Sequence, residues 1–283
     1  MALPQTLSNE EKQEEHSRSV SDAGRPNAFV LHEAIRKEGD EELRRDGLAL
    51  FTSAIAAGLT MGFSLIVPGV LKAHLPQASW SDLVVSIGYA TGFLIVVLGR
   101  QQLFTENTLT PILPLLHDRT WKTLRRVLRL WGIVLAGNVV ATLVIAAVLA
   151  HSGAFKPEVQ AAFGEISAHA IASPFSTTLI KAVFAGWLIA LMVWMLPATG
   201  SAAPFVIILL TWLVSMCSLA HIVAGSVDTF YLVLTGAASM GDYLWRFFVP
   251  TLLGNVFGGT ALVAVLNYGQ VAPQAEEKKS TEG

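Results

Sequence analysis

The chain contains four apolar segments of about 20 residues, the length that a helix needs to cross the hydrocarbon core of a membrane. They are Leu48–Leu71, Leu130–Ala150, Thr178–Leu196 and Phe247–Leu266. Hydrophobic residues make up 53% of the chain and charged residues only 14%, against about 25% charged residues in soluble domains. The sequence therefore predicts an all-α polytopic membrane protein.

Two further apolar segments, Leu83–Leu116 and Phe205–Ala238, are too long for one crossing and too short for two crossings with a turn. Each carries polar residues and glycine near its middle, GRQQLFTENT in the first and AHIVAGSVD in the second. We interpret each segment as a broken helix, with two half-spans joined by a loop at membrane depth. Because such backbone is tolerated only where protein buries it or a cavity solvates it, the breaks predict a pathway.

Short matches between the two halves of the chain indicate an internal repeat. The first span aligns with the fourth and the third with the sixth, through the pairs Ala54 and Ala182, Ala57 and Ala185, Gly58 and Gly186, Gly137 and Gly254, and Asn138 and Asn255. The broken second and fifth spans occupy equivalent positions between them. Because each half has three spans, we expect six transmembrane helices in two inverted three-helix repeats. Interrupted helices of such repeats usually meet at the permeation site.

Lysine and arginine residues close to the spans predict which face of the membrane is cytoplasmic. They are densest in the connection after the second span, HDRTWKTLRRVLRLWG, and others precede the first span and follow the sixth. With six crossings these three regions share one face. Both termini are therefore expected in the cytoplasm.

The six-span transporter or channel domain is expected at residues 48–268. The polar composition of residues 1–26 and 269–283 predicts two disordered cytoplasmic tails. Residues 27–47 predict an amphipathic cytoplasmic helix at the membrane surface, with an apolar stripe of Phe29, Val30, Ala34 and Ile35.

Composition and motifs argue against several classes of protein. The net charge of −2 offers no basic excess for binding nucleic acid, and the single cysteine, Cys217, excludes an internal disulfide. The sequence has no cluster of metal-ligating residues, no nucleophile beside a base and no paired intramembrane aspartates. We therefore expect neither an enzyme nor a metal site nor another cofactor.

His221 lies inside the second broken span, in the stretch LAHIVAGSVD. A histidine there either hydrogen-bonds a neighbouring span or serves the pathway. Ionisable residues within membrane spans are rare and mark functional sites by default. The reference pKa of histidine, about 6.5, suits it to exchange protons near neutral pH. The position of His221 at a predicted helix break favours the functional interpretation.

Four motifs together resemble the formate/nitrite transporter family: LFT in the second span, the histidine of AHIVAGS in the fifth, AAG in the first and GN-x-x-GG in the sixth. The resemblance is strongest to the YfdC-like branch of that family, through the segments RQQLFTENT, RLWG, GWLIA-x-MVWM and HIV-x-GSV. The resemblance covers all six spans, from Leu48 to Tyr268.

Membership of this family would imply a homopentamer in a bacterial inner membrane, with an aquaporin-like hourglass pore in each protomer. It would also imply conduction of small monovalent weak-acid anions such as formate, nitrite or acetate, often together with a proton. The partners expected are therefore other copies of the chain, a small anion, protons and membrane lipid. In this family an amphipathic helix lies beside the cytoplasmic pore mouth, so a role of this helix in gating or assembly is expected.

The resemblance also assigns roles to individual positions. His221 would relay a proton or select the anion, with Thr105 opposite it, and Leu103 and Phe104 would form the cytoplasmic constriction. Asn138 and Asn255 either hold the broken-helix backbone or face the pore, and Glu106 and Asp228 either cap half-helices, pair within the breaks or support the pore. The family's vestibule lysine has no clear match; Lys181 and His169 are the nearest candidates for vestibule charges, and the alternative for Lys181 is a snorkelling residue at the external end of the fourth span.

Some positions depart from the family pattern. Better-studied relatives usually carry a glutamate before the LFT triplet and before the histidine, where this chain has Gln102 and Ala220.

Two alternatives to an anion pathway stay open at this point. One is a neutral small-solute pore of aquaporin type, although the paired Asn-Pro-Ala motifs of such pores are absent from the sequence. The other is a non-conducting membrane relative.

Overall fold

The computed structural model describes residues 26–272, which form helices and no strand. The first half contains α2 (Ala28–Arg44), α3 (Gly47–Thr60), α4 (Phe63–His74), α5 (Ser81–Gly88), α6 (Ala90–Leu98), η1 (Glu106–Thr108), α7 (Ile112–Asp118) and α8 (Trp121–His151). The second half contains α9 (Pro157–Ala168), η2 (His169–Ile171), α10 (Phe175–Thr199), η3 (Gly200–Ala202), α11 (Ala203–Met216), α12 (Ala224–Leu234), α13 (Met240–Asp242), η4 (Tyr243–Phe248), α14 (Val249–Phe257) and η5 (Gly258–Val265).

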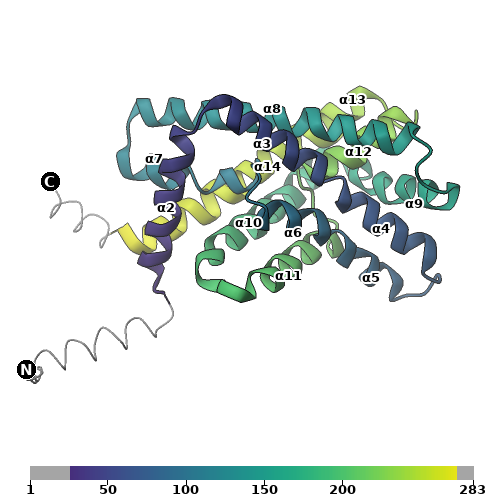
Figure 1. Ribbon diagram of the computed structural model, residues 1–283, viewed down its shortest axis with the longest axis horizontal. Helices are drawn as coiled ribbons and strands as arrows, with labels where there is room; N and C mark the ends of the chain where they lie inside the picture. Colours follow the sequence, from purple (N-terminus) through teal and green to yellow (C-terminus); the bar gives the residue numbers. More distant parts are fainter. Residues whose placement is uncertain (1–25, 273–283) are drawn as a thin grey trace, which may run out of the picture.

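The helices form an elongated bundle with two distinct ends (Figure 1). Helices α2 and α7 lie at one end, and the α4–α5 turn and α9 lie at the other. Helix α8 runs the length of the bundle between them. We call these ends the α7 end and the α9 end.

Five helical runs within the described residues are long and apolar enough to cross a membrane: Gly47–His74, Ser81–Leu98, Trp121–His151, Phe175–Met216 and Met240–Ala272. The prediction of an all-helical, multi-pass membrane protein is confirmed. The run Phe175–Met216 contains two helices, α10 and α11, because the chain turns at Gly200, which has a φ of +49°. Helix α12 is apolar but, on its own, too short to span a membrane.

Two boundaries differ from the sequence-based expectation. The arginine-rich segment that we expected as a connection is helical from Trp121, because the Thr120 hydroxyl caps the N–H of Thr123 and neither glycine nor proline interrupts the helix before Gly132. The last helical run continues through Ala272, so residues 269–272 belong to it and not to the expected tail. The rest of the two expected tails, residues 1–25 and 273–283, lies outside the described residues.

The expected amphipathic helix is present as α2, capped at its start by the Asn27 side chain. Its buried face, however, is His32, Ile35, Gly39 and Leu43, whereas Val30 is 50% exposed and Ala34 is also exposed. The reason is a close approach to protein: a Cβ atom on Gly39 would collide with the Thr110 carbonyl just before α7. The helix therefore packs against the bundle through a face that includes Ile35 of the predicted stripe, while Phe29 is half-buried.

The second predicted span is broken between α6 and η1. Helix α6 ends in a Schellman motif, in which the N–H of Gln101 donates to the Val96 carbonyl and the N–H of Arg100 donates to the Val97 carbonyl. Arg100 has a φ of +50°, in the left-handed region that favours glycine. The motif satisfies the last carbonyls of the helix and turns the chain into the loop.

The fifth predicted span is broken between α11 and α12 and ends in the same way. The N–H of Leu219 donates to the Val214 carbonyl and the N–H of Ser218 donates to the Ser215 carbonyl. Ser218 also has a φ of +50°. The two breaks thus share one backbone geometry with no residue in common at the turn.

Substitutions at Ser218 test this geometry. A left-handed conformation costs an ordinary L-residue about 1–2 kcal/mol, and a β-branched residue is worse still. We therefore expect Ser218→Val to unfold at a lower temperature than Ser218→Gly, with a difference in unfolding free energy of about 1–2 kcal/mol. Thermal unfolding in detergent measures the difference. Ser215→Val, a change at a helical position of α11, is the control and should have little effect; equal stability of the two Ser218 variants would contradict the assignment.

Candidate functional site

Two buried asparagines hold the loops of the two breaks. Asn138 on α8 accepts a hydrogen bond from the N–H of Phe104 (2.9 Å) and donates to the carbonyls of Ala54 (2.8 Å) and Gln102 (2.9 Å). Its side chain therefore ties the first loop to α3. Of the two roles left open by the sequence, the structure places Asn138 in contact with the broken-helix backbone.

Asn255 on α14 makes the matching contacts in the second half. It accepts from the N–H of Ile222 (2.8 Å) and donates to the carbonyls of Ala182 (2.8 Å) and Ala220 (2.9 Å). Ala182 is the position that the repeat pairs with Ala54. The two halves thus use the same side chain, in the same place, to fix equivalent loops.

Glycine permits the close helix packing on which these contacts depend. Helix α3 packs on α8, as α10 packs on α14. A Cβ atom on Gly58 would lie 2.6 Å from the Asn138 carbonyl oxygen, and one on Gly186 would collide with the Asn255 carbonyl. At both positions only glycine lets the helix backbones approach this closely.

The structure brings the two breaks together at His221 and Thr105. The Thr105 hydroxyl oxygen lies 2.7 Å from Nε2 of His221, and the two side chains are 0% and 1% exposed respectively. Phe93 packs edge-on against the imidazole, with ring centroids 4.9 Å apart. The predicted pair is therefore a direct contact between the two loops, buried in the middle of the bundle.

The second ring nitrogen fixes the tautomer of the neutral imidazole. Nδ1 of His221 accepts a hydrogen bond from the N–H of Ala224 (3.2 Å), at the start of α12. A neutral imidazole has one N–H, so its hydrogen is assigned to Nε2, which donates to the Thr105 oxygen. The Thr105 hydroxyl then keeps its own hydrogen available to donate to another acceptor.

Leu103 and Phe104 lie in the first loop and are 0% and 1% exposed. Phe104 packs edge-on against Trp131 of α8, with centroids 5.9 Å apart, and lines an apolar groove on the side of α8 and α14. Trp131 donates in turn to the Asn107 carbonyl (2.7 Å). Phe104 and the Asn107 carbonyl are therefore both held by Trp131 of α8.

A cavity of about 310 Å³ opens towards the α9 end of the bundle, and His221 lies among its lining residues. Ser64, Tyr89, Ser218 and Asp228 are among the others. Ser64 donates to the Tyr89 carbonyl (2.8 Å), which joins α4 to the start of α6. The lining is rich in hydroxyl and charged groups, so it can solvate an ion up to the position of His221.

Both expected vestibule charges, Lys181 and His169, line this cavity. The Lys181 ammonium donates to the Ser173 hydroxyl (3.1 Å). A second lysine of the lining, Lys72, lies 3.7 Å from Asp82 and 3.5 Å from Glu165. Lys181 is therefore the lining lysine without a carboxylate partner among residues 26–272.

The two acidic candidates lie apart. Asp228 is in the second turn of α12, half-buried, and lines the cavity. Glu106 begins η1 on the other side of the Thr105–His221 contact, and one of its carboxyl oxygens is buried without a hydrogen-bond partner among residues 26–272. Asp228 and Glu106, which the sequence grouped together as supports of the broken helices, therefore have different surroundings.

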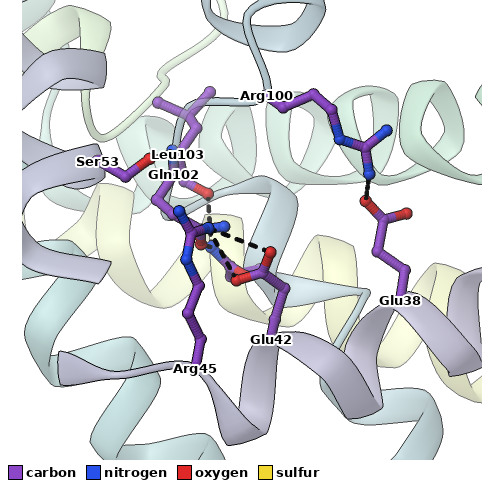
Figure 2. Close-up of polar contacts among 8 residues, drawn as sticks. Glu38, Glu42, Arg45, Ser53, Arg100, Gln102 and Leu103 are labelled. Carbon is purple, nitrogen blue, oxygen red and sulfur yellow. Dashed lines mark hydrogen bonds and ion pairs between the residues drawn. The ribbon is translucent and has the colours of Figure 1, made fainter. Parts of the chain in front are cut away.

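Charged residues of α2 face the first loop (Figure 2). Glu38 pairs with Arg100 at 2.6 Å and Glu42 pairs with Arg45 at 3.3 Å. Behind them the N–H of Gln102 donates to the Ser53 hydroxyl of α3 (3.1 Å). This polar cluster lies at the α7 side of the break.

Sequence reasoning missed several residues that shape the site. Gln102, noted only as a departure from the family, is buried and accepts a hydrogen bond from Asn107 (2.9 Å). Phe93 and Tyr89, beside His221 and in the cavity wall, lie in an apolar run without any distinguishing neighbour in the sequence. Only their three-dimensional placement reveals them.

Comparison with known proteins agrees with this geometry. The family profile described as formate/nitrite transporter matches residues 30–269. The chain belongs to the formate/nitrite transporter family. Inner membrane protein YfdC of Escherichia coli is 42% identical over 90% of this chain and 82% of its own length. The formate channel BtFdhC of Bacillus thuringiensis is 28% identical over 73% of this chain and 80% of its own.

Two solved structures have the same fold. A chain described as an FNT family ion channel superposes with a TM-score of 0.72 at 17% identity, covering 85% of this chain and 98% of that chain. A pentameric formate channel with formate bound gives 0.64 at 18% identity, covering 78% of this chain and 96% of that chain. The family and these neighbours are transporters and channels and not enzymes, as the sequence predicted.

Proposed function

We propose that each protomer forms a pathway for small monovalent weak-acid anions, such as formate, nitrite or acetate, that cross together with a proton at His221. The observation that carries the proposal is the buried Thr105–His221 contact between two broken helices, at the inner end of a polar cavity. The relatives described as formate channels support the choice of substrate class.

The energetics favour crossing as the neutral acid. An anion that enters an apolar, closely packed segment loses several kcal/mol of hydration, whereas its protonated form does not. Leu103 and Phe104 provide such a segment next to His221 and form the proposed constriction. A group that protonates the anion before this segment therefore lowers the barrier.

The hydrogen bonds of His221 define how the proton would move. The Nε2 proton passes to the Thr105 oxygen as the Thr105 hydroxyl proton passes to the anion. Because the neutral ring carries one proton, Nδ1 must gain a second proton and release the N–H of Ala224. The relay thus needs a supply of protons to Nδ1.

The same proposal includes topology and assembly. We place the α7 end, with the arginine-rich start of α8, in the cytoplasm and the cavity outside, and the six predicted crossings follow as two inverted repeats with both termini cytoplasmic. The YfdC relative and the pentameric neighbour support a homopentamer in a bacterial inner membrane. The mass of the detergent-solubilised particle tests this, and a particle without five protomers would contradict it.

Lys181 is expected to draw anions into the cavity. Replacing it with glutamine should lower formate uptake by about three- to tenfold at low ionic strength and by less at high salt, because salt screens the attraction. The matched control is Lys156→Gln, since Lys156 is exposed near α9 but outside the cavity lining. Equal uptake by the two variants at low salt would show that Lys181 has no such role.

Uptake into proteoliposomes tests the proposed substrate class. Formate, nitrite, acetate and lactate are compared with glycerol, a neutral solute of similar size to lactate. We expect uptake of the anions that rises as the external pH falls, and no entry of glycerol. Glycerol uptake without anion uptake would indicate a neutral-solute pore, and no uptake of any solute by an intact oligomer would indicate a non-conducting relative.

A further inference from the structure

We propose that Asp228 is the proton donor that supplies His221 from the cavity. This inference rests on the proposed function, because it concerns the source of the proton that the relay needs at Nδ1. Asp228 and His221 line the same cavity, and Gly225, which lies between them in the chain, lines it too. One face of the second break and of α12 therefore connects the two groups.

The separation of the two groups suits a short chain of water. Two loop residues and the first turn of α12 separate His221 from Asp228 along the chain. Gly225 contributes only backbone to the wall between them, and its missing side chain leaves room for the ring of Phe247. The cavity volume of about 310 Å³ accommodates several water molecules beside a small anion.

The carboxyl group of Asp228 is available for this role. No hydrogen bond or ion pair ties it to another side chain within residues 26–272, although it is half-buried. Asp228 can therefore take a proton from external water and pass it inwards.

The other ionisable groups around the cavity are less suitable. Those that line it are Lys72, Asp82, Tyr89, His169, Lys181 and His221, while Glu165 reaches it through Lys72 and Tyr243 faces α12 at Ser226. Asp82 is 87% exposed and pairs with Lys72, which leaves it at the mouth. Lysine and tyrosine hold their protons too strongly to donate at neutral pH. His169 is exposed and lies in η2, on a different element from His221. Asp228 is the unpaired carboxyl group on the helix that follows His221.

The proposed step is balanced in protons. The O–H bond of Asp228 breaks and an N–H bond forms at Nδ1 of His221, through the intervening water. The Nε2–H bond breaks as the Thr105 hydroxyl protonates the anion, and an O–H bond forms on the substrate. The Asp228 carboxylate then takes the next proton from external water. The ring, left with its hydrogen on Nδ1, turns over to bring that N–H back to Thr105, which restores the starting state.

The test compares Asp228→Asn, Asp228→Glu and Asp82→Asn in proteoliposomes with formate as the probe. Formate uptake and internal acidification are recorded from external pH 5 to pH 8. We expect Asp228→Asn to reduce the rate of proton-coupled formate uptake by at least about tenfold and to make the remaining uptake less dependent on pH. Asp228→Glu should restore both. Asp82→Asn removes a carboxylate from the mouth of the same cavity and takes one of two partners from Lys72, so it should change at most the amount of uptake and keep the pH profile of the unmodified protein.

Several outcomes separate this inference from the proposed function. A wild-type pH profile in Asp228→Asn would overturn the role of Asp228 alone. Higher uptake by that variant at every pH would overturn it too, since Asp228 would then repel anions. No formate uptake by the unmodified protein would overturn the proposed function and this inference together. Size-exclusion profiles and unfolding temperatures establish that each variant assembles normally.

Discussion

Replacing His221 with phenylalanine is expected to abolish proton-coupled formate flux. The aromatic ring fits the space beside Phe93, but the variant loses the donor to Thr105 and the acceptor for the N–H of Ala224. Without the relay the anion must cross unprotonated. A barrier higher by about 3 kcal/mol or more corresponds to a loss of at least about 100-fold in rate.

Thr105→Val provides the second half of this test. Valine keeps the shape of threonine and removes the hydroxyl that bonds Nε2, so flux should fall by about tenfold or more. The matched control is Thr229→Val, because the Thr229 hydroxyl is buried in α12 and donates only to the Gly225 carbonyl of its own helix (2.7 Å). If His221→Phe and Thr105→Val conduct like this control, His221 is a structural residue.

Removing either bridging asparagine is expected to have the largest effect on stability. Asn255→Ala leaves a buried N–H of Ile222 and the carbonyls of Ala182 and Ala220 without their partner, and Asn138→Ala does the same in the first half. Each unpaired group costs about 1–3 kcal/mol, so we expect a loss of about 3 kcal/mol or more for each variant. Thermal unfolding of the detergent-solubilised protein measures this loss.

Variants of the same residues refine the result. Asparagine-to-aspartate changes keep an acceptor for the loop N–H but lose the donor to both carbonyls, so they should not rescue stability. Thr142→Val on α8 is the control, since Thr142 bonds only the Val139 carbonyl of its own helix (2.9 Å). An Asn255→Ala protein as stable as this control would show that the loop is held by other contacts.

The sequence predicted the main features of the fold because they follow from length and hydrophobicity. Apolar length predicted the spans, and polar residues within over-long segments predicted both breaks between helices. The paired glycines and asparagines predicted equivalent positions such as Asn138 and Asn255, which make matching hydrogen bonds. A single sequence is enough to recognise these features, because the membrane hydrocarbon and the close packing of helix backbones each restrict which residue types can occur.

Other features could not be predicted, because residue type does not determine them. The two breaks have the same hydrogen-bond pattern at the helix end, yet the turns read GRQQLF and CSLAHI and differ at every matching position. The buried face of α2 depends on how closely Gly39 approaches Thr110, which the apolar stripe alone does not indicate. Asp228 was expected in or near the break, whereas the helix resumes at Ala224 and carries it into the cavity wall.

The most direct test of the central claim measures charge and formate together. Proteoliposomes with an internal pH indicator and a membrane-potential dye are given a formate gradient, with the unmodified protein and with His221→Phe. We expect one proton to enter with each formate, no change of membrane potential, and loss of both fluxes in the variant. Formate entry that generates a membrane potential without internal acidification, equal in both proteins, would contradict proton-coupled crossing at His221.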